Sequence, residues 1–483
     1  VSSARGRGKR GVGLLELVGF HQVAGRLDIG KGGRRAQQQG NQGAHRAWAF
    51  LVVAALMPAV AAAEPLPAAL SAADFHPVDH KQAALGQLLF YDKILSGNKN
   101  ISCGTCHHPK FGTSDGLSLG IGEGGVGLGT DRHAGTGHSR IERRVPRNAP
   151  ALWNLGARQV HTLMHDGRIS AANTYGNAFN TPAEEWLPEG IDTVLAAQAF
   201  FPLTSETEMA GGTGENEVAG AVTDRIDNGW PIVAKRVRTI PEYGRKFVAA
   251  FPHITAPHEV TIVEIANALA AFQAVEFRSI DSPFDQYLAG DATALDAPQK
   301  RGLDLFYGAA NCASCHSGPL LSDQKFHAIG VPPFGPGRTR RFDLIARDVG
   351  RLGESDRLED AYKFRTPMLR NVALTAPYGH NGAHQTLAEM IRQHMDPHAA
   401  FDTWTPASAR LPKADWLQQA DFLIWQDRSE IDRQKRVLSP SSPLLSAAQV
   451  GDLVAFLQAL TGTTLDTPPF GVPTQVPSGL PVD

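Results

Sequence analysis

Apolar residues recur at the three- to four-residue spacing of an α-helix in several stretches of the chain. The clearest stretch is 260–291, in which four apolar side chains fall on one helical face: Ile262, Ile265, Leu269 and Phe272. Similar patterns occupy 299–308 and 446–462, the second of which opens on a Ser cap and closes on Gly462. Because little of the chain shows the two-residue period of a β-strand, we predict a mainly α protein.

The first 63 residues have a different character. Residues 1–46 contain nine basic and two acidic side chains and no periodic apolar face, so we expect a disordered basic leader there. The run 47–63 is uncharged and apolar and ends in three alanines. Following the basic Arg46, it predicts a secretory signal peptide at about 46–63. The alternative is a membrane anchor, but the run is short and contains Pro58.

Export predicts a periplasmic protein, and no later apolar run is long enough to place a membrane span in the mature chain. The 46 basic and 48 acidic residues of the whole chain nearly balance, so its net charge does not point to nucleic acid as a partner.

The four cysteines occur in two C-x-x-C-H motifs, formed by Cys103, Cys106 and His107 and by Cys312, Cys315 and His316. This is the attachment pattern of a c-type haem, in which two thiols bond the porphyrin and the adjacent His binds the iron. Disulfides, a zinc site or a thioredoxin-like motif are alternatives, but none of them explains a His after each pair. We therefore predict two covalently bound haem c groups, with His107 and His316 as iron ligands.

The two motifs lie in similar surroundings. A helix-like segment and a turn precede each motif, at 86–102 and 299–311, and an Arg-Asn pair near a proline follows each, in 146–156 and 364–382. The halves are therefore predicted to be two cytochrome c-like helical domains. We place these domains and their appendages at 64–290, at 291–465 with an insertion at 396–445, and at 466–483 for a Pro-rich tail.

Several segments are similar to the bacterial di-haem cytochrome c peroxidase family, including its MauG-like members. The matching segments are LSGNKNISCGTCH, RNAPALWN, HDGR, residues 195–210, SPFDQYLAGD, CASCHSGP and FRTPMLRNVALTAPY. The resemblance implies two α-helical haem domains with a calcium ion between them. It also implies that the N-terminal haem reacts with hydrogen peroxide, and that the C-terminal haem passes on electrons from a small cytochrome c or cupredoxin.

The resemblance implies a peroxide pocket as well. The family places a Gln, a Pro four residues later and a Glu ten residues later above the first haem, and here these are Gln198, Pro202 and Glu208. Since peroxide cleavage needs a group that takes and returns a proton, Glu208 is the candidate acid/base, and Gln198 would orient peroxide or water. Glu206 is a weaker candidate. The residues alone favour a surface loop with two acids, and it is the resemblance that favours the pocket.

Two positions near the first haem depart from the pattern of many family peroxidases. Those proteins carry a removable His ligand sixteen residues after the proximal His, where this chain has Glu123. A carboxylate is a poor haem ligand, so we predict an open first iron that needs no reductive activation, with His133 or His138 as alternative ligands. The family also often has a Trp between the haems, just before Asp-Gly-Arg, where this chain has His165.

The sixth ligand of the second haem is predicted by the same resemblance. Counting fourteen residues from His380 leads to His394, and Met395 beside it is the alternative. The implied calcium ligands are the Asn148 side chain and the carbonyls of Thr375 and Pro377. Arg147 and Arg370 are expected to pair with haem propionates, with surface salt bridges as the alternative.

The insertion 396–445 contains three tryptophans, Trp404, Trp416 and Trp425. We expect it to form a lid whose aromatic side chains pack over the haem domain, and a docking surface for a protein partner is the alternative.

Three functions fit the sequence. The first is a periplasmic peroxidase that reduces hydrogen peroxide to water with electrons relayed through the C-terminal haem. The second is a MauG-like enzyme that oxidises Trp or Tyr of a protein partner, and the third is a non-catalytic electron-transfer protein. Family members are often dimers, so a homodimer is possible.

Overall fold

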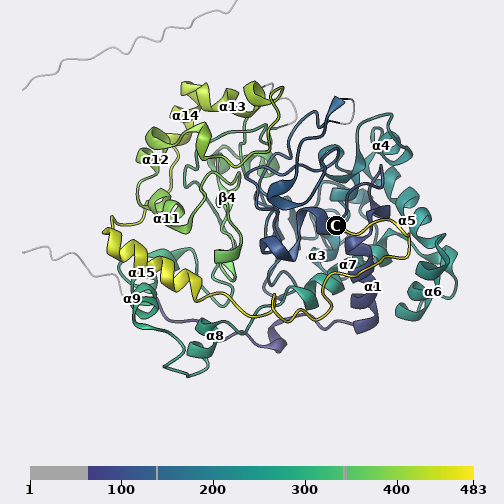
Figure 1. Ribbon diagram of the computed structural model, residues 1–483, viewed down its shortest axis with the longest axis horizontal. Helices are drawn as coiled ribbons and strands as arrows, with labels where there is room; N and C mark the ends of the chain where they lie inside the picture. The colour runs from purple at the N-terminus through teal and green to yellow at the C-terminus, as the bar shows by residue number, and fades with distance from the viewer. Residues whose placement is uncertain (1–63, 138–139, 341–342, 344) are drawn as a thin grey trace, which may run out of the picture. The chain divides into compact units, whose positions relative to one another are not determined.

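The computed structural model describes residues 64–137, 140–340, 343 and 345–483. The predicted leader and signal peptide lie outside the described residues. Within these residues the regular structure is mainly helical and the strands are two short antiparallel pairs, which confirms the predicted fold class (Figure 1).

The helices are α1 (His80–Tyr91), α2 (Cys103–Cys106), α3 (Val194–Gln198), α4 (Glu217–Val222), α5 (Trp230–Arg238), α6 (Pro241–Ala250), α7 (Ile262–Glu276), α8 (Pro283–Leu288), α9 (Ala297–Tyr307), α10 (Leu352–Ser355), α11 (Leu387–Met395), α12 (Pro397–Thr403), α13 (Gln418–Gln426), α14 (Arg428–Lys435) and α15 (Ala447–Gln458). The strands are β1 (Thr162–Leu163) paired with β2 (Ile169–Ser170), and β3 (Phe326–His327) paired with β4 (Phe364–Arg365).

One helix pair occurs in each half of the chain. Helix α1 packs against α7, and α9 packs against α15 (Figure 1). Each pair is closest at a glycine: a Cβ added to Gly86 would lie 1.9 Å from the Ala268 carbonyl oxygen, and one added to Gly302 would lie 2.0 Å from the Asp452 carbonyl oxygen. Both glycines begin the same G-x-x-L-F-Y pattern, so the internal repeat seen in the sequence corresponds to a repeated helix crossing.

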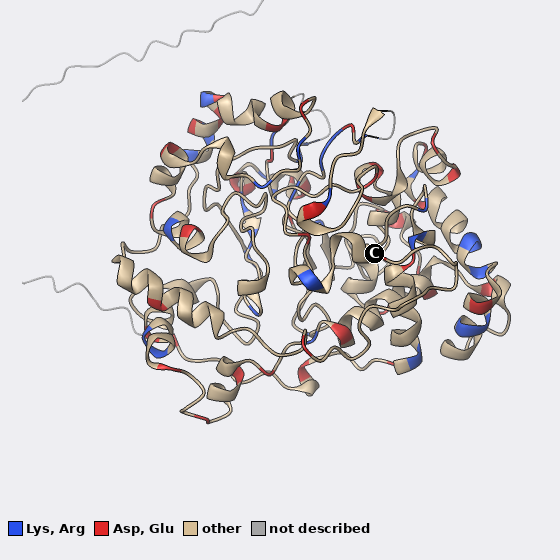
Figure 2. Cartoon of the chain, viewed as in Figure 1, with Lys and Arg blue, Asp and Glu red and all other residues tan. Residues whose placement is uncertain are grey.

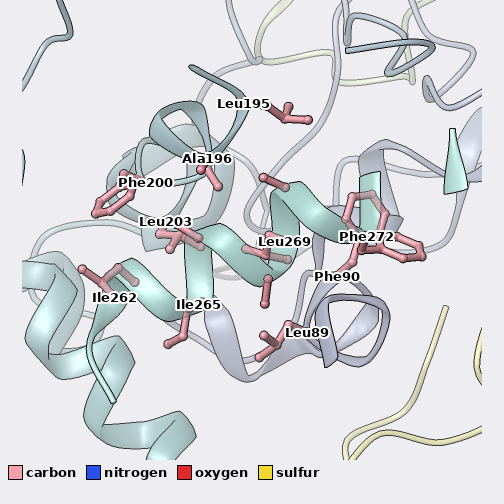
Figure 3. Close-up of a cluster of buried hydrophobic side chains, with 14 of the residues drawn as sticks. Leu89, Phe90, Leu195, Ala196, Phe200, Leu203, Ile262, Ile265, Leu269 and Phe272 are labelled. Atoms are coloured by element: carbon pink, nitrogen blue, oxygen red, sulfur yellow. The ribbon is translucent and has the colours of Figure 1, made fainter. Parts of the chain in front are cut away.

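Helix α7 is the centre of the first core. Thr261 caps its N-terminus through a bond from the Val263 N–H. The predicted face of Ile262, Ile265, Leu269 and Phe272 is buried against α1 and α3, as Figure 3 shows. The rings of Phe90 and Phe272 lie 5.2 Å apart. The opposite face of α7 is buried as well, so this helix lies in the interior of the first core.

A second core lies between α8, α9 and α15. The Phe456 ring lies 5.3 Å from Phe284 and 5.1 Å from Phe306. Helix α9 ends at Gly308 as predicted, whereas α15 ends at Gln458, before the predicted Gly462. Phe284 belongs to this second core, although it precedes the domain boundary that the sequence predicts near residue 290. That boundary stays a prediction.

The C-terminal segment 466–483 returns to the first half. Val476 is buried in the first core, and the Ser478 hydroxyl donates to Asp92 at 2.6 Å. The Asp483 carboxylate pairs with Lys93 and accepts a bond from the Thr105 hydroxyl. The tail therefore contacts the loop of the first C-x-x-C-H motif.

Acidic and basic residues are mixed on the helices of both halves (Figure 2).

Candidate active site

The first C-x-x-C-H motif lies on the short helix α2. Its first turn is held by the Ser102 N–H, which donates to the Thr105 hydroxyl at 2.9 Å. Cys103 and Cys106 form no disulfide, and burial raises the pKa of each thiol to about 12. The His107 Nδ1 lies 2.9 Å from the Thr113 carbonyl oxygen, and this bond leaves Nε2 as the nitrogen available to a metal.

The second motif repeats this arrangement on a 3₁₀ turn. Cys312 and Cys315 are free, and burial raises the pKa of the Cys312 thiol to about 12. The His316 Nδ1 lies 3.1 Å from the Leu321 carbonyl oxygen. Both proximal histidines therefore have the same tautomer and an unshared Nε2.

A second imidazole faces His316. The ring of His394, on α11, lies 6.3 Å from the His316 ring, and its Nδ1 lies 2.8 Å from the Met390 carbonyl oxygen. Two imidazoles on one iron, with His–metal bonds of about 2.0–2.1 Å, place their ring centroids about 6.3 Å apart. The chain thus presents a His pair that fits a six-coordinate haem iron. Met395 is the last residue of α11, beside His394.

The predicted peroxide-pocket residues lie on three consecutive short elements. Gln198 ends α3, Pro202 begins a 3₁₀ turn, and Glu208 lies in a π-helical turn, Glu206–Ala210. Single π-helical turns are often found at functional sites. The negative charge of Glu208 contributes to the raised pKa of the Cys106 thiol, which places Glu208 near the first attachment motif.

Glu206 points elsewhere. Its carboxylate forms an ion pair with Arg143, and both side chains are more than half exposed. Glu206 is therefore engaged at the surface, and Glu208 stays the predicted acid/base.

Glu123 is half-buried and accepts hydrogen bonds from two side-chain amides. The side-chain nitrogens of Asn98 and Asn100 lie 2.9 Å and 2.6 Å from its Oε1. His133, one of the two alternative ligands, is exposed, and the other, His138, lies outside the described residues. The carboxylate at the position of the removable ligand is therefore already bound by the protein.

His165 lies inside the protein, between segments of the two halves. Its Nε2 is 3.1 Å from the Asn148 carbonyl oxygen, and its own carbonyl accepts a bond from the Arg365 N–H at 2.8 Å. Burial, together with the charge of Arg147, lowers its pKa to about 4. The imidazole is therefore neutral near pH 7.

Comparison with known proteins points to one family. A family model described as di-haem cytochrome c peroxidase matches residues 80–293. The cytochrome c551 peroxidase of Pseudomonas aeruginosa is 30% identical over 319 residues, which are 66% of this chain and 73% of that protein. The methylamine utilization protein MauG of Methylorubrum extorquens is 29% identical over 322 residues, 66% of this chain and 70% of that protein.

A crystal structure of a MauG-like protein associated with microbial copper homeostasis has a TM-score of 0.54 and 27% identity, and the match covers 89% of this chain and 100% of that one. The chain belongs to the di-haem cytochrome c peroxidase family. It is an oxidoreductase of the cytochrome c peroxidase type, and membership in this family implies two haem c groups.

In this family member, Arg147 and Arg370 are not surface residues. Arg147 is buried and binds Asp166 at 2.5 Å and Asp348 at 2.7 Å. Arg370 is buried against Asp285, and its second terminal nitrogen is buried without a hydrogen-bond partner. The surface salt-bridge alternative is therefore wrong for both residues, because each ion pair lies in the interior.

The segments that carry the proposed calcium ligands meet. The Asn148 N–H donates to the His380 carbonyl at 2.9 Å, and its side-chain nitrogen donates to the Leu117 carbonyl at 2.7 Å, so the amide oxygen is the atom left for a cation. Gly112 is tightly packed on the backbone of Leu374, next to Thr375. The calcium site itself stays a prediction.

The insertion 396–445 packs as expected for a lid. Trp404 is buried and stacks on Phe334 at 5.2 Å, and Trp425 lies 4.8 Å from Trp404. Trp416 is 38% exposed, and its indole N–H donates to the Ile141 carbonyl at 2.9 Å. Two of the three tryptophans thus belong to packing, and one reaches the surface beside the loops of the first haem site.

The sequence analysis missed several residues that support the site. Arg132 donates to three carbonyls of the Gly-rich loop, those of Ile121, Gly122 and Gly127. Asp166 and Asp348 were not noticed, although Asp166 belongs to the quoted HDGR motif. Asn98 and Asn100 lie in the LSGNKNISCGTCH segment, but nothing in the sequence pairs them with Glu123.

In the described part of the chain, no helix is both long and apolar enough to cross a bilayer.

Proposed function

We propose that this protein is a periplasmic di-haem peroxidase that reduces hydrogen peroxide to water at the N-terminal haem, with electrons relayed through the C-terminal haem. The observation that carries the proposal is the asymmetry of the two motifs. His316 is opposed by a second imidazole, whereas the loop after the first motif packs through Gly122 on the turn that carries Glu208, and the adjacent Glu123 is bound by two amides. In this proposal the second site, with two imidazoles, transfers electrons, and the first site binds a small molecule.

The residues that would hold the haems follow from the geometry. Cys103, Cys106 and His107 would hold the first, and Cys312, Cys315, His316 and His394 the second. When bound, the first haem supplies an iron that binds peroxide and passes electrons to it. Two nitrogen ligands on the second iron favour its ferric form more than a thioether ligand would.

Glu208 moves the proton in this proposal. Hydrogen peroxide takes up two electrons and two protons and gives two waters. The Glu208 carboxylate would take a proton from one peroxide oxygen and return it to the other, which leaves as water. Gln198 holds peroxide or water through its amide, and Pro202 shapes the turn between these two side chains.

His165 is the proposed group between the two haems. It is neutral and fixed by Asn148 and Arg365, so it provides a rigid path without a change of charge. The electron donor would be a small cytochrome c or cupredoxin. Asn148, Thr375 and Pro377 would hold a calcium ion that joins the loops on which this path depends.

A MauG-like reaction, in which an aromatic residue of a protein partner is oxidised, is the second candidate. It is favoured by two observations: Glu123 stands where the removable ligand would be, and His394 faces His316. Both fit a diferric protein that reacts with peroxide without prior reduction.

The test is to add peroxide to the oxidised holoprotein as isolated and to follow the haem spectrum. Rapid change without reduction, together with slow turnover of reduced cytochrome c, favours the MauG-like candidate. Rapid turnover of reduced cytochrome c supports the peroxidase, and no reaction in any redox state leaves only an electron-transfer protein. Replacing Glu208→Gln should slow the peroxide reaction by about 10²–10⁴-fold. A variant that reacts at the wild-type rate would remove the acid/base assignment.

A further inference from the structure

The turn that carries Glu208 is contacted by two loops. A Cβ added to Gly122 would lie 2.1 Å from the Thr207 carbonyl oxygen and 2.8 Å from the Glu208 Cα. At the other end of the turn, the Gly97 N–H donates to the Met209 carbonyl at 2.7 Å. A Cβ added to Gly97 would lie 1.8 Å from the Ala210 carbonyl oxygen. The backbones of both loops therefore set where the turn, and with it Glu208, is located.

Glu123 joins these two loops. It follows Gly122 in one loop, and its Oε1 accepts bonds from Asn98 at 2.9 Å and Asn100 at 2.6 Å in the other. Hydrogen bonds from an amide N–H to an ionised carboxylate are stronger than hydrogen bonds between two neutral groups. The Glu123 Oε2 is buried without a hydrogen-bond partner, so these two bonds orient the group.

The same network continues to the end of the turn. The second N–H of the Asn98 amide donates to Glu215 at 2.6 Å, and the Asn98 side-chain oxygen accepts from Asn216 at 2.9 Å. The Asn216 amide nitrogen also lies 2.8 Å from the Ala210 carbonyl oxygen, at the last residue of the turn. The network thus connects Glu123 to the last residue of the turn, while Gly122 beside it packs on Thr207 and Glu208.

We propose that Glu123 is a positioning residue of the peroxide pocket. Its carboxylate, held by Asn98 and Asn100, fixes the Gly-rich loop against the π-helical turn and so sets the place of the Glu208 carboxylate. The position that holds a removable haem ligand in other family members here holds an anchor of the distal pocket. This role rests on the proposed acid/base function of Glu208.

The experiment measures the rate of cyanide binding to the ferric holoprotein as a function of pH. Hydrogen cyanide must give up a proton to bind iron, as peroxide must, so its rate reports the distal base without turnover. Glu123→Ala should slow binding by about 10–100-fold and change the pH profile, because a displacement of about 1 Å can reduce a reaction that depends on geometry by 10²-fold. Glu123→Gln should stay within about threefold of wild type, because its amide oxygen still accepts both bonds.

Two further variants separate positioning from other effects. Glu206→Gln is the matched control, since Glu206 lies on the same turn but forms only an exposed ion pair, and it should bind cyanide at the wild-type rate. The double variant Glu123→Ala/Glu208→Gln should be no slower than Glu208→Gln alone, because the two residues act as one unit. Additive slowing would contradict the positioning role.

The outcomes also distinguish this proposal from the function on which it rests. If Glu208→Gln binds cyanide as fast as wild type, the acid/base role is wrong and the positioning role falls with it. If Glu208→Gln is slow but Glu123→Ala is not, only the positioning role is wrong. Haem content and far-ultraviolet circular dichroism check that Glu123→Ala folds. If it does not, Asn98→Ala/Asn100→Ala removes the same two bonds from the opposite loop and takes its place.

Discussion

The two halves of this protein contain the same kind of predicted haem-attachment site but differ in the side chains that accompany the proximal His. In both, a helix with a G-x-x-L-F-Y pattern crosses a partner helix at a glycine, and a C-x-x-C-H motif follows. In both, the proximal His is bonded through Nδ1 to a backbone carbonyl. The halves differ in what accompanies this His: the His394 imidazole faces His316 in the second half, whereas the first half carries Glu208 on a π-helical turn, which we propose lies opposite His107.

In the proposed function, the repeated unit therefore supplies cofactor attachment, while the segments inserted around it supply the chemistry. Glu208 comes from the region between the first motif and α7, and His394 comes from α11. Neither segment belongs to the repeated helix pair, so each half could acquire its function without changing how it binds haem.

The largest expected effect comes from removing one attachment site at a time. Cys103→Ala/Cys106→Ala should leave a protein with one haem that no longer reacts with peroxide, since the first iron is the proposed site of reaction. Cys312→Ala/Cys315→Ala should also leave one haem, but this protein should still react with peroxide and lose only turnover with a reduced donor. Haem content by mass spectrometry and stopped-flow spectra check this, and equal loss of reaction in both variants would contradict the division of roles.

A second change makes the two halves more alike. His394→Ala should open the second iron and convert its low-spin ferric signal to high spin in electron paramagnetic resonance, because the imidazole opposite His316 is removed. Met395→Ala is the matched control and should leave the signal unchanged. A low-spin signal that survives His394→Ala and disappears in Met395→Ala would assign the ligand to Met395 instead.

The smallest effect concerns the group between the halves. The pKa of His165 is about 4 in the folded protein and 6.5 in a model peptide, so the unfolded chain binds the proton first as the pH falls. The stabilisation from the neutral imidazole is therefore complete above about pH 6.5 and is lost between about pH 6.5 and pH 4, with a total of about 3 kcal/mol. Thermal or urea unfolding of wild type and His165→Gln across this range should show a flatter pH dependence in the variant. Parallel curves would show that His165 does not titrate in this way.

Several features of the helices could be predicted from the pattern of neighbouring residues in the sequence. The buried face of α7, the Ser446 cap of α15, and the end of α9 at Gly308 all follow from spacing and capping residues close together in the chain. The end of α15 was less accurate, because Gly462 instead donates its N–H to the Asn371 side chain at 2.8 Å, a contact across the fold. The interior ion pairs of Arg147 with Asp166 and Asp348 were missed for the same reason, as Asp348 comes from the other half.

The sequence by itself predicts where the two haems attach, because two thiols and an adjacent imidazole within one turn of chain are the pattern of that chemistry. It also determined the family and the helical class. Only the tertiary structure decided that His394 faces His316, that Glu123 is bound by Asn98 and Asn100, and that the tail contacts the first motif. These are contacts between segments far apart in the chain, and no local spacing encodes the packing that brings them together.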